Sequence, residues 1–307
     1  MDFLCGQWRF FFISVVGPLA LRLVIFPVLP LWGTLLWRRF GKLRGGLALF
    51  LPPMVLGLSL EVGVFSFLWA VQWMALGPIL AECLHRDWGI SRAMATALIA
   101  TLALQAGVMA LWAIEAGEFP WRLLQREMEK ILNQASHLPI QGQGPSSLPK
   151  ELIPELARAA VIVFPGLLAS LDLMLHWWNL LVQRRLPRLW NGRPPGPENL
   201  DEWGIPFHLV WVTIGGGLLI LSSLDPLKSI GVNVVLAMAF VHLLQGVAVV
   251  AFLLRKKGAP RFLRWLVFGA IFLQHFFTAA TAAIGLFDVW FDFRRRLGTT
   301  SQLWRER

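Results

Sequence analysis

VIVFPGLLASLDLMLHWWNLLV, residues 161–182, is an apolar stretch long enough to cross a bilayer, and it carries an acid near its middle. At 100° per residue, Asp172, His176 and Asn179 lie within about 60° of one another on a helical wheel. An ionised carboxylate at the bilayer centre costs at least about 2.5 to 3.5 kcal/mol on insertion scales. This polar stripe is therefore expected to face the interior of a helix bundle, and the stretch predicts an integral membrane protein.

The composition of the whole chain supports the same class. Of its 307 residues, 56% are hydrophobic and only 15% are charged, whereas soluble globular proteins have about 25% charged residues. The net charge of +10 does not indicate nucleic-acid binding, because the Lys and Arg residues form short clusters between apolar stretches. Cys5 and Cys83 are too few and too far apart for a metal site or a disulfide framework. We expect no cofactor, no metal and no nucleic-acid partner.

The other apolar runs predict an all-α fold, a polytopic transmembrane helix bundle of about eight spans. The number becomes nine if residues 10–37 form a hairpin and not one kinked helix, since Pro18, Pro27 and Pro30 interrupt that run. The run at 47–84 is long enough for two crossings. The expected spans lie within residues 10–37, 47–84, 93–114, 161–182, 207–224, 230–254 and 265–287.

This pattern divides the chain into an N-terminal transmembrane half (1–114), an extramembrane segment (115–158), a C-terminal transmembrane bundle (159–296) and a basic tail (297–307). In the extramembrane segment, Trp121 and Ile131 belong to an apolar row at helical spacing opposite several charged residues. That row predicts an amphipathic helix, either on the membrane surface or packed on the loops of the bundle.

Basic clusters give an orientation with one conflict. Residues 37–44, 85–92, 183–206 and 255–264 are the expected cytoplasmic loops, because Lys and Arg concentrate on that side of bacterial membranes. With eight spans the same choice sends Arg294, Arg295 and Arg296 outside, against the rule. One wrongly assigned span would remove this conflict.

A second polar stripe occurs in the last predicted span, where Gln274, Thr278, Thr281 and Gly285 are spaced 4, 3 and 4 apart. Small and hydroxyl residues at this spacing allow close helix packing, and they also suit a polar cavity shared with the Asp172 stripe. The preceding span adds two polar residues on one face. The predicted intramembrane polar site comprises Asp172, His176, Asn179, His242, Gln245, Gln274, Thr278 and Thr281.

Two runs carry a family resemblance: LLQGVAV at residues 243–249 and GLFDVWFDFRR at residues 285–295. On these motifs the chain resembles the YybS-like bacterial membrane proteins, a family of unknown function. That family is similar in presumed fold to the substrate-binding subunits of energy-coupling-factor vitamin transporters. The resemblance implies a helical bundle in the bacterial cytoplasmic (inner) membrane that binds a small molecule.

Three classes of function stay open. The buried polar stripes favour a small-molecule transporter or a substrate-binding transporter subunit. The basic loops and the lack of a sharp motif favour a structural membrane protein that binds a protein partner. An intramembrane enzyme would use Asp172 and His176 as an acid/base pair, but no nucleophile, metal cluster or phosphate loop accompanies them. We therefore expect no enzymatic activity, and we expect the bilayer, a small solute or a membrane protein as partners.

Overall fold

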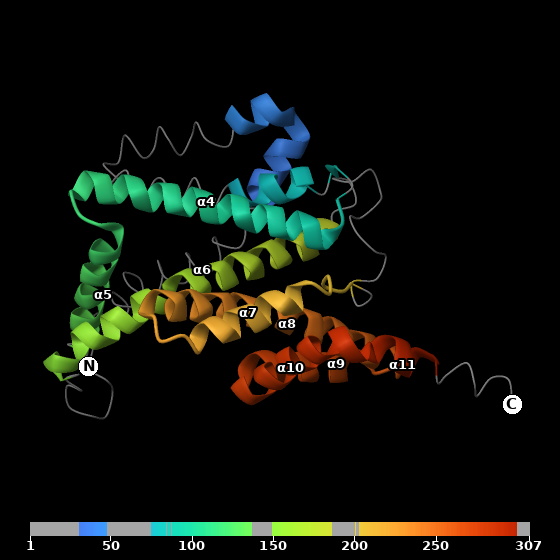
Figure 1. The fold of residues 1–307 in the computed structure, drawn as a ribbon. Helices are drawn as coiled ribbons and strands as arrows, with labels where there is room; N and C mark the ends of the chain where they lie inside the picture. Colours follow the sequence, from blue (N-terminus) through green and yellow to red (C-terminus); the bar gives the residue numbers. More distant parts are fainter. Residues whose placement is uncertain are drawn as a thin grey trace, which may run out of the picture. The chain divides into compact units, whose positions relative to one another are not determined.

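The computed structural model describes residues 31–47, 75–83, 85–86, 88–136, 149–185, 200 and 203–299. Every regular element within these ranges is helical, which confirms the predicted all-α class for this part of the chain (Figure 1). Several predictions lie largely or wholly outside the described residues. They concern the path of residues 10–37, the two crossings of 47–84, the linker around 138–149 and the end of the tail.

Residues 31–47 and 75–83 are helical, and the helices that follow carry the labels of Figure 1. Their bounds are α4 Ile90–Ala116, α5 Pro120–Ser136, η2 Lys150–Leu152, α6 Ile153–Arg184, α7 Leu209–Ile220, α8 Asp225–Lys256, α9 Arg261–Leu273, α10 His275–Phe291 and α11 Phe293–Thr299. In the described ranges α4, α6 and α8 are long and apolar enough to cross a membrane, and the bent pair α9–α10 makes a fourth if counted as one span. The predicted eight spans are thus not confirmed.

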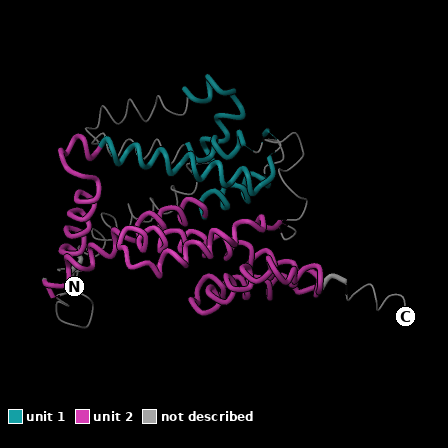
Figure 2. Tube along the Cα trace, viewed as in Figure 1, with its two compact units in different colours: residues 1–111, 174–195 teal, residues 112–173, 196–307 magenta. Residues whose placement is uncertain are grey.

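The chain forms two compact units (Figure 2). One unit comprises residues 1–111 and 174–195, and the other comprises residues 112–173 and 196–307, so α6 contributes to both. In the first unit, Lys42 pairs with Glu82 at 2.6 Å, and the Gln183 side chain donates to the Thr34 hydroxyl at 3.2 Å. The hydrogen bond from Lys42 lowers the pKa of Glu82. These contacts join the helix at residues 31–47 to the helix at residues 75–83 and to the end of α6.

In the second unit, the side-chain amide of Asn233 on α8 inserts into the backbone hydrogen-bond ladder of α6. Pro165 has no N–H to continue the hydrogen-bond ladder of α6. Beside it, Asn233 of α8 donates to the Ile162 carbonyl at 2.7 Å and accepts from the Gly166 N–H at 2.6 Å. These two backbone groups would bond to each other in a regular helix. The proline and the asparagine together fix where α8 crosses α6.

The helix α7 is shorter than the predicted span 207–224. Its 12 residues measure about 18 Å, well under the roughly 30 Å of a bilayer core. It packs against α8 at two glycines, because a Cβ on Gly231 would lie 2.6 Å from the Gly216 carbonyl oxygen. The turn at residues 221–224 then reverses the chain into α8.

The last predicted span is wrong as a single helix, because the chain bends by 101° between α9 and α10. Gln274 adopts an extended backbone at the bend, with φ −113° and ψ 113°. The Thr278 hydroxyl donates to the carbonyl of Ile271, a group that a continuous helix would satisfy through the backbone N–H of His275. Thr278 therefore stabilises the break and does not belong to a uniform polar face.

The bend also bears on the orientation conflict. Arg294, beyond α10, donates through Nη1 to the Trp203 carbonyl at 2.7 Å, and Trp203 belongs to the predicted cytoplasmic loop 183–206. If α9 and α10 enter and leave on one side, the basic tail joins the other basic loops and the conflict disappears.

We expect the loop 255–264 and the tail to lie on the same side of the membrane. Cysteines placed singly at Lys257 and Arg296, both exposed, should react alike with a membrane-impermeant thiol reagent in intact cells when Cys5 and Cys83 are replaced by Ala. Labelling of one position but not the other would show that α9 and α10 cross the membrane together.

Candidate functional site

The polar stripe predicted in residues 161–182 lies on one face of the continuous helix α6. Asp172, His176 and Asn179 are all fully buried. Gln183 extends this face by one more turn and is fully buried as well. Gln183 was not predicted as a site residue, although its spacing of four from Asn179 continues the pattern. We call these residues, Asp172, His176, Asn179 and Gln183, the α6 polar face.

The amides of this face use their donors within the protein and keep an acceptor open. Asn179 donates from Nδ2 to the Leu175 carbonyl at 2.8 Å, and Gln183 donates from Nε2 to Thr34. The oxygens Asn179 Oδ1 and Gln183 Oε1 are buried and have no hydrogen-bond partner among the described residues. A buried acceptor left unpaired costs about 1–3 kcal/mol, so this arrangement is not explained by stability alone.

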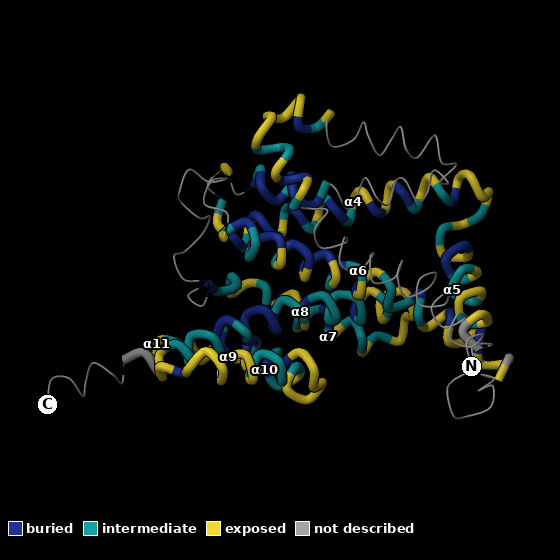
Figure 3. The backbone as a smooth tube through the Cα atoms, turned by 180° about the vertical axis from the view of Figure 1, so that it is seen from behind, coloured by how far each residue is buried: buried dark blue, intermediate teal, exposed yellow. Residues whose placement is uncertain are grey.

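The first unit adds polar residues from α4. The backbone of Ala97 lies beside His176. Thr101 and Gln105 follow Ala97 at intervals of four, which puts all three on one face of α4, and all three are buried. Buried and exposed positions recur in turn along α4 (Figure 3). The Thr101 hydroxyl donates to the Leu98 carbonyl at 2.9 Å. The face of α4 that carries Ala97 is therefore polar further along the helix.

Three of the five residues predicted on the later helices lie at the contact between α8 and α10. His242, Gln245 and Thr281 are buried there. His242 Nε2 shares a 2.8 Å hydrogen bond with the Thr213 hydroxyl of α7. Gln274 is exposed at the α9–α10 bend, so the predicted stripe from Gln274 to Gly285 is not one helical face.

A second polar cluster surrounds Asp288, which is 4% exposed near the end of α10. Its Oδ2 accepts from Gln245 Nε2 at 2.6 Å and from Arg294 Nη2 at 2.9 Å, and its Oδ1 accepts from the Phe293 N–H at 2.9 Å. Asp292 makes the turn that returns Arg294 to this carboxylate, since its φ of 44° lies in the left-handed region. The carboxylate is fully paired.

The cluster also holds the approach to α7. Gln245 Oε1 accepts from the Ile205 N–H at 3.0 Å, and Arg294 donates to the Trp203 carbonyl. We call Gln245, Asp288, Arg294 and the backbone of residues 203–205 the Asp288 network. Gln245 was predicted as a site residue, but its amide is committed to this network. The sequence did carry a signal for the side chains of this network, because they lie in the two runs that carry the family resemblance. Gln245 comes from the run at 243–249, and Asp288 and Arg294 come from the run at 285–295.

A comparison with family models finds one described as "Predicted membrane protein (DUF2232)", which matches residues 9–289. The chain belongs to this family. No curated protein and no solved structure matches it. The DUF2232 match includes Gln245 and Asp288 and ends before Arg294. Within the described ranges of this DUF2232 protein, no group of three or more His, Cys, Asp or Glu residues is placed to hold a metal ion.

Proposed function

We propose that this DUF2232 protein is a transporter, or the substrate-binding subunit of one, and that the α6 polar face binds the transported solute. The observation that carries the proposal is the contrast between the two buried polar clusters of the protein, the Asp288 network and the α6 polar face. The Asp288 network pairs its carboxylate with three donors, as a structural cluster does. The α6 polar face instead leaves amide oxygens unpaired in the interior of the protein.

The chemistry of this face suits a solute that donates hydrogen bonds. Its open groups are the acceptors Asn179 Oδ1 and Gln183 Oε1, while the amide donors are already used. Asp172, buried on the same face, adds a carboxylate that favours a positive charge when ionised. A small cation, or a solute with an amine, would pair both with the open amide oxygens and with the Asp172 carboxylate. We treat these residues as binding groups and not as catalysts.

The bacterial cytoplasmic membrane, crossed several times, is part of this proposal. The resemblance to YybS-like proteins, and through them to the substrate-binding subunits of vitamin transporters, supports a solute-binding bundle by analogy of fold. The apolar lengths of α4, α6 and α8 support more than one crossing.

A melting screen tests the proposal on the purified full-length protein. Small amines, alkali cations and uncharged analogues would be added to the wild type, to Asp172→Asn and to Glu118→Gln, which removes a half-buried acid that pairs with Arg126 on the loop before α5. A solute at about 100 times its Kd stabilises a protein by about 2.7 kcal/mol. We expect an amine or cation to raise the Tm of the wild type and of Glu118→Gln but not that of Asp172→Asn. Equal shifts in all three proteins would contradict a site at Asp172.

A further inference from the structure

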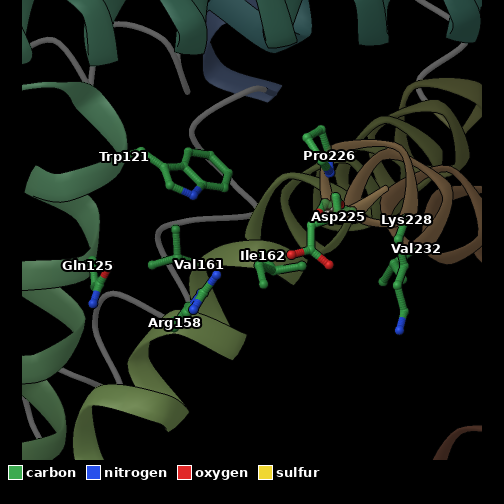
Figure 4. Close-up of a pocket in the computed structure, with 10 residues that line it drawn as sticks. Trp121, Gln125, Arg158, Val161, Ile162, Asp225, Pro226, Lys228 and Val232 are labelled. Atoms are coloured by element: carbon green, nitrogen blue, oxygen red, sulfur yellow. Dashed lines mark hydrogen bonds between the residues drawn. The ribbon is translucent and has the colours of Figure 1, made fainter. Parts of the chain in front are cut away.

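A cavity of about 590 Å³ lies among α5, α6 and α8, in the second unit. Two cations and one acid line it: Arg158 of α6, and Lys228 and Asp225 of α8 (Figure 4). Trp121 of α5 forms part of its wall. None of the α6 polar face or the Asp288 network lines this cavity, so it is separate from the proposed transport site.

The two cations mark the place where both long helices become apolar. After Arg158, α6 has no charged residue until Asp172, and after Lys228, α8 has none until Arg255. One turn deeper, the cavity is lined by the aliphatic side chains of Val161 and Val232. In a bilayer, phosphate groups lie at this boundary and acyl chains begin just below it.

The helix α5 forms the third wall of the cavity, and it has the features of a helix at the membrane–water interface. The helix α5 is amphipathic as predicted, with Leu123 and Leu124 buried and Arg122 and Arg126 exposed. Trp121, at its start, is 47% exposed and contributes to the cavity. An indole with one apolar and one polar edge is favoured at the membrane–water interface.

We propose that this cavity binds the headgroup of a membrane phospholipid, and that phosphatidylethanolamine fits it best. The phosphate group would be held by Arg158 and the primary ammonium by Asp225, and Lys228, on the other side of Asp225 in Figure 4, would add positive charge for the phosphate. The structure has no ion pair among these three side chains, so their charges are open to a ligand that carries both signs. Val161, Val232 and Trp121 would contact the glycerol and the first methylenes of the acyl chains.

Native mass spectrometry of the purified full-length protein tests this site. Phosphatidylethanolamine, phosphatidylglycerol and phosphatidylcholine with identical acyl chains would be titrated in detergent. We expect Arg158→Gln/Lys228→Gln to weaken the binding of phosphatidylethanolamine about tenfold or more, the effect of losing charge-assisted hydrogen bonds. Arg122→Gln removes an exposed cation of α5 that does not line the cavity, and it should bind as the wild type does.

Asp225 gives a second test, which is informative even if the double variant Arg158→Gln/Lys228→Gln does not fold. Asp225 is exposed, so Asp225→Asn is expected to fold normally. It should lower the affinity for phosphatidylethanolamine and raise that for phosphatidylglycerol, because the repulsion of an anionic headgroup is removed. An unchanged order of lipid affinities in Asp225→Asn would overturn the headgroup assignment.

The source of the phosphate is tested with soluble probes. Glycerophosphoethanolamine and inorganic phosphate lack acyl chains, and we expect neither to displace the lipid at equal concentration. Displacement by either compound would show that the cavity takes a soluble phosphate ester, and it would overturn the lipid proposal. Equal lipid binding by wild type and Arg158→Gln/Lys228→Gln would overturn the site itself.

Discussion

Gly246→Ala is expected to lower the amount of folded protein sharply, although it adds only one methyl group. A Cβ at Gly246 would overlap the Thr281 carbonyl oxygen of α10, and a Cβ at Gly285 would overlap the His242 carbonyl oxygen of α8. Both obstacles are backbone atoms, so no change of rotamer relieves them. The helices α8 and α10 would have to separate, at a cost of about 1–3 kcal/mol for the overlap alone. Separation would also pull Gln245 away from Asp288.

Gly269→Ala in α9 is the matched control. Nothing lies within 4 Å of a Cβ at this position, and alanine favours a helix over glycine by about 1 kcal/mol. Thermal melting of the purified variants should therefore show a lower Tm for Gly246→Ala and an equal or higher Tm for Gly269→Ala. Similar melting of the two variants would contradict the close contact of α8 and α10.

Arg294→Gln is expected to have the largest effect on stability, because it leaves the charge of Asp288 buried. The ion pair between Arg294 and Asp288 is 2.9 Å long, with side-chain exposures of 16% and 2%. Removing one partner of a buried ion pair typically costs about 3–5 kcal/mol. The substitution also removes the bond to the Trp203 carbonyl, so the approach to α7 loses a contact with α10.

Lys42→Gln provides the comparison, since its ion pair with Glu82 is exposed on the lysine side and such pairs contribute about 0–1 kcal/mol. The double variant Asp288→Asn/Arg294→Gln should recover part of the loss, because it removes the buried charge. Melting curves of the three variants would decide the point. An Arg294→Gln protein as stable as Lys42→Gln would show that the Asp288 network does not stabilise the C-terminal bundle.

The helical class and the polar face of α6 could be predicted because both depend on local spacing. The period of apolar residues gives a helix, and Asp172, His176 and Asn179 share a face in any α-helix. The same reasoning found α8 as one long apolar helix and α5 as an amphipathic one. Predicted boundaries were less accurate, since α6 begins at Ile153 and not near residue 161.

The break between α9 and α10 was not predictable in this way. The run 265–287 is apolar and contains no proline, so composition indicates one continuous span. The break depends on long-range contacts of α10 with α8. Gly285 packs against α8, and Asp288 accepts a hydrogen bond from Gln245, 43 residues earlier. These contacts fix the direction of α10, and the hydroxyl of Thr278 satisfies the Ile271 carbonyl, which has no helical N–H donor at the break.

The measurement that tests the central proposal most directly is the activity of Asp172→Asn at known abundance. Asparagine keeps the volume of the side chain and removes a charge that is expensive to bury, so a merely structural Asp172 should tolerate the change. We predict that Asp172→Asn inserts and melts as the wild type does but fails to complement a deletion strain, while Glu118→Gln complements fully. Full complementation by Asp172→Asn at wild-type abundance would contradict a functional site on the α6 polar face.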